Sequence, residues 1–404
     1  MADSAAERYV RLGLRLGRRV DGIVDAYFGP PELKAEVDAE PQVERRTLVA
    51  DADGLLGELE DGWLRDQVVG LRTYAGVLAG EAIPYADEVE GCYGVRPSWT
   101  EEAVFDAAHQ RLEDVLPGDG SLAERHKRWK ASLLVPAERV EETIGAVIEA
   151  ARGQTRSLVD LPAGEGVEVE IVRDKPWWAF CEYLGDLRST ISVNVDLPMS
   201  AVELVRLAMH ETYPGHHTER ACKEQTLVRD RGLLEETIVM VPTPQSLVAE
   251  GIAVLAAELL LDGDGAAAAL TSVLRDAGIE LDFAHARAVE RALDPCRWVE
   301  VNAALMLHER GANATQTQAY LERWGLLKPE LAAHLVRFFK QPTSRTYILT
   351  YPAGRDLCRS YVGGAPERFA RLLTEQVRVP DLLSGANERS RAPGRTTPDP
   401  RSDT

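Results

Sequence analysis

Helical periodicity is the feature that most constrains the fold of this 404-residue chain. Over most of its length apolar residues recur every three or four positions, the spacing that gathers them on one face of an α-helix. The first such stretch runs from Arg8 to Tyr27 and stops at the helix-breaking sequence Gly29-Pro30-Pro31. Similar patterns cover residues 43–61, 64–80, 100–115, 121–133 and 136–158. The sequence therefore predicts a mainly α-helical fold.

One stretch departs from helical spacing. Apolar and polar residues alternate in Val167–Val172 and again in Ile191–Val195, which is typical of strands with one buried face. Because the two segments lie close together in the sequence, we expect them to form a small antiparallel β-sheet. The expected fold class is thus a large helical fold with two lobes, a deep cleft and this small sheet.

Length and composition suggest how the chain is divided. With 45% hydrophobic residues, the chain is long enough to bury a large core. We place an N-terminal helical lobe at residues 1–160 and a second lobe, expected to carry the chemistry, at residues 161–385. From residue 386 the composition shifts to Asn, Ser, Arg, Thr and Pro, so residues 386–404 are expected to form a disordered tail.

Composition also argues against several classes of protein. The net charge of −19 disfavours nucleic-acid binding, which requires a basic surface. No segment reaches the ~18 consecutive apolar residues of a membrane span, and the first residues lack the apolar stretch of a signal peptide. The five cysteines are scattered and odd in number, as expected for reduced thiols in a cytoplasmic protein. No pattern indicates an oligomeric state.

The strongest chemical signal is the segment His210-Glu211-Thr212-Tyr213-Pro214-Gly215-His216-His217, which contains three of the eight histidines. A catalytic zinc ion is often held by two His and one Glu. In the common His-Glu-x-x-His motif, the histidines at i and i+4 share one helical face. Here Pro214 occupies i+4 and the next histidine is at i+6. A regular helix would separate His210 from His216 by about 9 Å along its axis.

The Pro214-Gly215 pair offers a way around this separation. Proline lacks an N–H and its ring clashes with the carbonyl of His210, and glycine adopts backbone angles closed to other residues. We therefore expect an opened turn that returns His216 to the place that i+4 would occupy. The helix that leads into the motif is predicted to start at a capping box formed by Ser200 and Glu203.

A second acid supplies the remaining ligand. The segment Ser246–Leu261 is almost wholly apolar and closes at Asp262-Gly263, so it is predicted to be a buried helix. A buried carboxylate is costly unless it is paired or bound to a metal, which makes Glu250 the ligand candidate on this helix. Glu258, two turns further on, is expected to form a salt bridge or to support the ligands.

These residues also carry a resemblance. The sequence His-Glu-x-x-Pro-Gly-His-His, followed by Glu-Gly-x-Ala at Glu250, resembles the bacterial family known as domain of unknown function 885 (DUF 885). The segments Ser192–Pro198 and Tyr351–Arg355 are similar to that family as well. The chain departs from the family at Glu219 and Ile252, where the family has Gln and Trp. Members resemble carboxypeptidase Taq-like zinc metallopeptidases of the gluzincin group, so the resemblance implies a helical metallopeptidase.

The resemblance implies a role for each motif residue. His210, His216 and Glu250 would bind Zn²⁺, and Glu211 would act as general base on a metal-activated water. His217 would be either a partner of the ligands or an alternative ligand.

Further residues are candidates for contacts with the substrate. Tyr347, Tyr351 and Arg355 offer phenol and guanidinium groups that stabilise an oxyanion or hold a carboxylate. In metallopeptidases of the resembled type an edge strand beside the zinc helix pairs with the extended substrate, and the strand that contains Asn194 is expected to fill this role.

The resulting hypothesis is a zinc-dependent, carboxypeptidase-like hydrolase that acts on short peptides. Two alternatives stay open at this point. One is an amidase that acts on a small, non-peptide amide. The other is a metal-free helical binding protein, because a helix C-terminus attracts His and a Pro-Gly pair is an ordinary helix stop.

Overall fold

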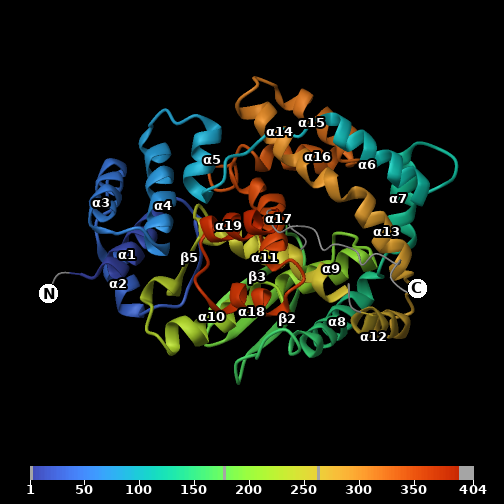
Figure 1. Cartoon of the computed structure of the whole chain (residues 1–404), viewed down its shortest axis with the longest axis horizontal. Coiled ribbons are helices and arrows are strands. Elements are labelled where there is room, and N and C mark those ends of the chain that lie inside the picture. The colour runs from blue at the N-terminus through green and yellow to red at the C-terminus, as the bar shows by residue number, and fades with distance from the viewer. Residues whose placement is uncertain (1–2, 176–178, 262–263, 391–404) are drawn as a thin grey trace, which may run out of the picture.

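The computed structural model describes residues 3–175, 179–261 and 264–390. Most of these residues are helical, and the strands form only two small sheets (Figure 1). The predicted fold class, mainly α-helical with a small sheet, is confirmed.

The helices fall into two runs along the chain. The first run consists of α1 (Ala5–Gly17), α2 (Pro31–Ala39), α3 (Arg45–Glu58), α4 (Trp63–Ala79), α5 (Tyr85–Tyr93), α6 (Glu102–Val115), α7 (Leu122–Ser132) and α8 (Val140–Thr155). The second run consists of α9 (Ala201–Glu211), α10 (His216–Lys223), α11 (Pro244–Leu261), α12 (Asp264–Asp276), α13 (Phe283–Leu293), α14 (Val299–His308), α15 (Ala314–Trp324), α16 (Pro329–Phe338), α17 (Thr350–Val362), α18 (Pro366–Thr374) and α19 (Val379–Ser390).

The smaller sheet corrects the first predicted helix. Helix α1 ends at Gly17, and the stretch predicted to continue it to Tyr27 instead contains strand β1 (Val24–Tyr27). Strand β1 pairs antiparallel with β5 (Ile238–Met240), more than 200 residues away. A short apolar segment can form either a helix or a strand. Here the segment forms a strand because it pairs with β5, which is distant in the sequence.

The larger sheet has the strand order β2-β4-β3. Strands β2 (Gly166–Val172) and β4 (Arg188–Asn194) cover the two alternating segments except for Val195. They pair with each other in parallel, so the expected antiparallel pairing of these two segments is wrong. Strand β3 (Ala179–Gly185) pairs antiparallel with β4 through a two-residue turn at Asp186-Leu187. Both turn residues have positive φ, as a type I′ hairpin turn requires. The sheet is therefore mixed, because β3 returns along β4 on the side opposite to β2.

This strand order corrects the expected substrate strand. Strand β4, which contains Asn194, has neighbours on both sides, so its backbone groups are already used within the sheet. Within the described residues, β3 and β2 are the edge strands. Of these two edge strands of the larger sheet, β3 contributes residues to the cavity described below and β2 does not.

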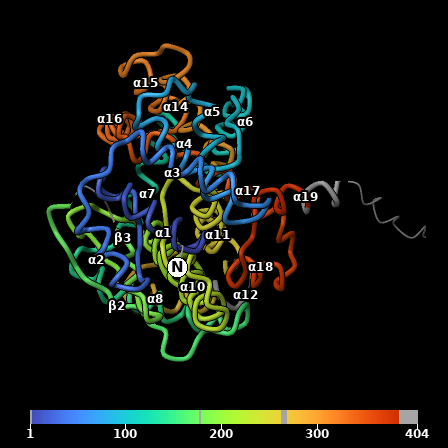
Figure 2. The backbone as a smooth tube through the Cα atoms, turned by 90° about the vertical axis from the view of Figure 1, so that its left-hand side faces the viewer, coloured from blue at the N-terminus to red at the C-terminus, as the bar shows by residue number. Residues whose placement is uncertain are grey.

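Helix α11 lies near the centre of the molecule in both views (Figures 1 and 2). It crosses α17 at two glycines, Gly251 and Gly354, where a Cβ on either residue would meet backbone of the other helix. By length and composition α11 could span a membrane, but 83% of it is buried inside the protein, as in the core helix of a globular fold. The close crossing brings the Glu250 turn of α11 against the Tyr351 turn of α17.

Two main hydrophobic cores share the interior. The larger one joins side chains of α1, α3, α4 and α5 to those of α11, α14 and α17. The second joins α8 to β3, β4, α9 and α12. Each core combines helices from before and after residue 160, so the predicted boundary at 160 separates neither. Helix α19 runs to Ser390, past the predicted start of the tail at 386, and residues 391–404 lie outside the described residues.

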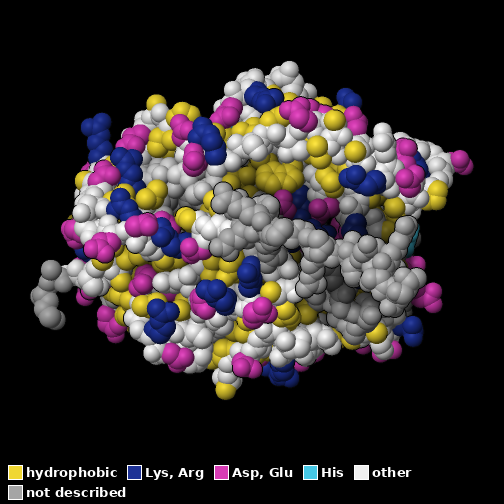
Figure 3. Space-filling model, viewed as in Figure 1, with side chains coloured by type: hydrophobic (Ala, Val, Ile, Leu, Met, Phe, Trp, Pro, Cys, Tyr) yellow, Lys and Arg dark blue, Asp and Glu magenta, His cyan; other side chains and the backbone are white. Residues whose placement is uncertain are grey.

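Acidic and basic side chains are interspersed on the face shown in Figure 3, with no large area of either sign. None of the five cysteines forms a disulfide, and four of them are buried. Burial raises the pKa of the Cys181 thiol to about 12, which leaves that thiol protonated and unreactive at neutral pH.

Candidate metal centre

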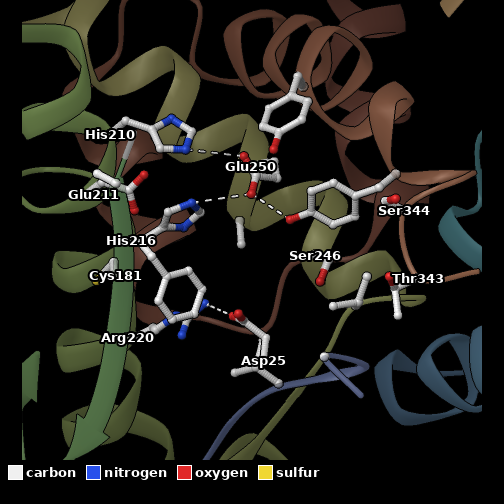
Figure 4. A pocket seen from close by; sticks show the side chains of 18 of the residues that line it. Asp25, Cys181, His210, Glu211, His216, Arg220, Ser246, Glu250, Thr343 and Ser344 are labelled. Atoms are coloured by element: carbon white, nitrogen blue, oxygen red, sulfur yellow. Dashed lines mark hydrogen bonds and ion pairs between the residues drawn. The ribbon is translucent and has the colours of Figure 1, made fainter. Parts of the chain in front are cut away.

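Two of the three motif histidines, His210 and His216, face a cavity of about 300 Å³ (Figure 4). Its wall is built from β1, β3, β5, α9, α10, α11, the end of α16 and the segment that leads into the start of α17. The charged and polar residues of the wall are Asp25, His210, Glu211, His216, Arg220, Ser246, Glu250, Thr343, Ser344, Tyr347 and Tyr351. Segments from the N-terminal strand β1 to helix α17 thus converge on one cavity.

The opened turn predicted in the motif is present. Helix α9 starts at the capping box of Ser200 and Glu203 and ends at Glu211. A four-residue break follows, and α10 begins at His216. A Cβ at position 215 would collide with the carbonyl oxygens of Met209 and His210, so only glycine fits where the chain folds back on the end of α9.

The break brings His216 next to His210. The two imidazole rings lie 4.7 Å apart and nearly perpendicular, and each Nε2 is 3.4 Å from a carboxylate oxygen of Glu250. One ligand atom from each of the three residues fits within 4.8 Å of the others. The three predicted ligands therefore converge, although they come from three different helices.

Two atoms of this cluster lack the hydrogen bonds that buried polar atoms normally make. Glu250 Oε2 and His216 Nδ1 are buried and have no hydrogen-bond partner in the described part of the chain. A cation between the three side chains would give the carboxylate oxygen the partner it lacks. Two imidazoles and one carboxylate match the donor set of a zinc site, so the residues fit this ion.

The charges of the cluster are strongly coupled. Burial by itself would raise the pKa of Glu250, but the adjacent His216 and His210 lower it to about 2. Burial lowers the pKa of His210 to about 4, which keeps this imidazole neutral and able to bind a metal. Burial would also lower the pKa of His216, but Glu250 raises it to about 9. In the absence of a metal, a proton on His216 therefore balances the Glu250 carboxylate.

Glu211 follows His210 directly and also lines the cavity. Burial raises its pKa to about 7. A carboxyl group with a pKa near neutrality can both accept and donate a proton, which is the property of a general acid–base residue.

Two tyrosines complete this end of the cavity, Tyr347 just before α17 and Tyr351 in its first turn. The Tyr347 hydroxyl donates a 2.6 Å hydrogen bond to Glu250 Oε1, which fixes the orientation of that carboxylate. The ring of Tyr351 lies 6.5 Å from the ring of His210. Both predicted tyrosines are thus at the site, Tyr347 against a ligand and Tyr351 beside one.

His217 lies on the other side of α10. It is fully buried, with Nδ1 2.8 Å from Ser189 Oγ and Nε2 3.1 Å from Glu165 Oε2. The Tyr213 hydroxyl and the Arg152 guanidinium also bind Glu165. Both ring nitrogens of His217 are engaged, so the structure offers His216 and not His217 to a metal.

Three other predicted site residues lie outside the cavity. Arg355 pairs with Glu258 at 2.7 Å and with Asp294 at 2.9 Å, so Glu258 has the salt bridge predicted as one of its roles. The Asn194 side chain bonds to backbone groups of Lys175 and Asp196. None of the three lines the cavity wall.

Three residues that lie at or near the site were not predicted from the sequence. Arg220 lies four positions after His216, and that helical spacing was a usable signal because it gives both the same face. Asp25 lies in a segment predicted to be helical, and Glu165 precedes the first strand of the larger sheet, so neither had a local signal.

Two solved structures share this fold. One, from Colwellia psychrerythraea and provisionally described as a lipoprotein, is 15% identical with a TM-score of 0.55 over 89% of this chain and 65% of that one. The other, from Shewanella oneidensis and provisionally described as a lipoprotein of unknown function, is 12% identical with a TM-score of 0.51 over 92% of this chain and 69% of that one. This chain therefore spans less than two thirds of the first neighbour.

At such low identity the likeness concerns the fold alone. Neither a family model nor a curated protein matches this chain.

Proposed function

We propose that this protein is a zinc-dependent hydrolase that cleaves peptide bonds in short peptides. The observation that carries the proposal is the convergence of His210, His216 and Glu250 on a cavity, with one buried Glu250 oxygen that accepts no hydrogen bond from the described residues. Three protein ligands with an open side toward a substrate cavity are the arrangement of catalytic zinc sites. The resemblance of the motif to DUF 885 agrees with this proposal.

Zinc at this site would supply a water molecule that is activated for attack at neutral pH. Glu211 would accept a proton from that water as its oxygen bonds to the peptide carbonyl carbon. Glu211 would then pass the proton to the amine nitrogen as the C–N bond breaks. The Tyr351 hydroxyl would donate a hydrogen bond to the oxyanion that forms on the carbonyl oxygen.

The size of the cavity supports a small substrate. Its volume, about 300 Å³, is at the lower end of the range for small-molecule sites. Phe180, on edge strand β3, is 45% exposed and lines the cavity. An extended peptide would add to this edge by main-chain hydrogen bonds, the role that was expected from the sequence for the strand of Asn194.

The first test is the metal content of protein purified without a histidine tag, measured by elemental mass spectrometry. We expect about one zinc per chain in the wild type and in Glu211→Gln, and hydrolysis of a mixed short-peptide library by the wild type alone. Glu211→Gln keeps all three ligands, so it separates metal binding from proton transfer.

Helix α12 offers a control position, Arg275→Gln, which is distant in sequence from every cavity residue and should change neither quantity. Wild-type protein that takes up no zinc when it is offered would refute the proposal. Full hydrolysis by Glu211→Gln would refute the role of Glu211 while leaving the metal site intact.

A further inference from the structure

The end of the cavity away from Glu250 contains a second charged pair that the proposed metal chemistry does not use. Arg220 of α10 forms an ion pair with Asp25 of β1, and both residues line the cavity. In Figure 4 this pair lies on one side of His216, while His210 and Glu250 lie on the other. One cavity thus contains a candidate metal centre and a separate guanidinium.

Arg220 has unused hydrogen-bonding capacity. Its side chain is nine-tenths buried, and Nη2 donates to Asp25. The other terminal nitrogen, Nη1, is buried without a hydrogen-bond partner in the described residues. Leaving a buried charged donor unpaired is costly, and because Asp25 already holds Nη2, Nη1 is the terminal nitrogen left for a ligand. The missing partner is therefore a hydrogen-bond acceptor, and a carboxylate oxygen would make the strongest bond because that bond is charge-assisted.

The position of Arg220 limits where that acceptor lies on a substrate. Arg220 is four residues after His216, so one helical turn, about 6 Å along the axis of α10, separates the two positions. One residue of an extended peptide spans at most about 3.6 Å. An anion at Arg220 would therefore be one or two residues away from a group held beside His216.

We propose that Arg220, oriented by Asp25, is an anion subsite that binds the terminal carboxylate of a short peptide and thereby selects its C-terminal end for cleavage. The identity of the substrate rests on the hydrolase function proposed above, whereas carboxylate binding at Arg220 does not. Asp25 is a positioning residue, because its carboxylate holds Nη2 and leaves Nη1 for the ligand.

The binding step is tested on metal-free protein, prepared with a chelator, by isothermal titration calorimetry. Three probes share one phenylpropyl skeleton: 3-phenylpropanoate, its neutral amide, and the cationic 3-phenylpropylamine. We expect the carboxylate to bind about tenfold to a hundredfold more tightly than the amide, as charge-assisted hydrogen bonds do. We expect Arg220→Gln to abolish this preference and Arg220→Lys to retain part of it.

Two further variants keep the test interpretable. Arg220→Gln alone leaves Asp25 unpaired, so the double variant Asp25→Asn/Arg220→Gln, which removes both charges, guards against misfolding, and circular dichroism monitors the fold. Arg229→Gln removes an arginine that pairs with Glu224 and Asp186 outside the cavity, and it should bind the carboxylate as the wild type does.

The outcomes separate this inference from the proposed function. Equal binding of carboxylate and amide, or carboxylate binding that persists in Arg220→Gln, overturns the subsite. Tighter binding of the amine, lost in Asp25→Asn, overturns it as well and assigns the pair to a cation. If carboxylate binding depends on Arg220 but the protein takes up no zinc when zinc is offered, the subsite stands and the hydrolase fails. If the zinc-loaded protein cleaves peptide acids and peptide amides equally, the hydrolase stands and the C-terminal selection fails.

Discussion

His216 and His217 are consecutive on α10, and each faces a buried glutamate, but their surroundings differ. His217 has partners at both ring nitrogens, and its glutamate, Glu165, also binds a tyrosine and an arginine. In the described part of the chain, His216 Nδ1 and Oε2 of its glutamate, Glu250, have no hydrogen-bond partner. The hydrogen bonds of the His217 pair are complete within the protein, whereas the Glu250 carboxylate has an oxygen left for a ligand.

The difference shows how two identical residue types acquire different uses. A satisfied network of buried polar groups rigidifies its surroundings, and the Glu165 network holds Tyr213, which lies inside the break between α9 and α10. An unsatisfied group beside a cavity leaves capacity for an ion or a substrate. The Glu165 side therefore stabilises the turn whose other side presents the candidate ligands.

The largest expected effect is on zinc content, when His216 and His217 are replaced by alanine one at a time. His216→Ala should lose almost all bound zinc, because it removes one of three ligands. His217→Ala should keep about one zinc per chain and lose stability instead. Elemental analysis of both variants beside circular dichroism measures this, and zinc retained in the first but lost in the second would reverse our assignment.

Removal of Glu165, the glutamate that pairs with His217, should mainly lower the free energy of unfolding. In Glu165→Ala the buried His217 and Tyr213 and the half-buried Arg152 lose a common partner, and breaking a buried ion pair typically costs about 3 kcal/mol or more. Urea denaturation at pH 7 measures the loss in free energy of unfolding. As a control, Glu168→Ala removes an exposed acid of β2 that pairs with Arg188 and should cost less than about 1 kcal/mol. Equal losses in both variants would contradict the importance of the network.

The same network should also make stability depend on pH in the acid range. Burial would raise the pKa of Glu165, but hydrogen bonds from His217 and Tyr213 and the ion pair with Arg152 lower it from 4.5 to about 2. A lowered pKa stabilises the fold above the unfolded value of 4.5, and that contribution is lost as the pH falls toward 2.

The stability difference between wild type and Glu165→Gln should therefore shrink by about 2 kcal/mol between pH 5 and pH 3. Urea titrations across this range provide the measurement. A difference that stays constant with pH would show that Glu165 is not held ionised by its neighbours.

The smallest effect is expected on zinc affinity, when the hydrogen bond from Tyr347 to the candidate ligand Glu250 is removed. Tyr347→Phe removes the donor to Glu250 Oε1, and loss of such a supporting bond typically weakens metal binding about tenfold. Competition with a chelator measures the zinc affinity. Tyr351→Phe, which removes a hydroxyl that makes no hydrogen bond to Glu250 in the described residues, should leave that affinity unchanged. Equal affinities in wild type and Tyr347→Phe would show that the bond has no role in holding the ligand.

Local sequence patterns predicted much of the fold and of the metal-ligand set. The capping box at Ser200, the break at Pro214 and the buried helix around Glu250 each depend on residues within a few positions of one another. The three candidate ligands were predicted for the same reason, because each lies in a helix or turn with a distinct local signal. The close crossing of Gly251 and Gly354 explains how two of these local elements meet.

Other features had no local signal. The segment Val24–Tyr27 became a strand because Ile238–Met240 pairs with it, and β4 became a central strand because β3 folded back along it. Arg355 and Glu258 were both marked as site candidates, but they satisfy each other away from the cavity. The pairing of Glu165 with His217 across 52 positions also needed the folded chain.

The sequence by itself thus determined the helical class, the capped and broken helix of the motif, and the identities of His210, His216 and Glu250. Only the tertiary structure decided which histidine of the pair faces the cavity, which strand forms its edge, and that Asp25 and Arg220 stand at its far end. The physical reason is range. Helix caps and turns are set by neighbours in the chain, whereas the satisfaction of a buried charge depends on groups that folding brings from far away.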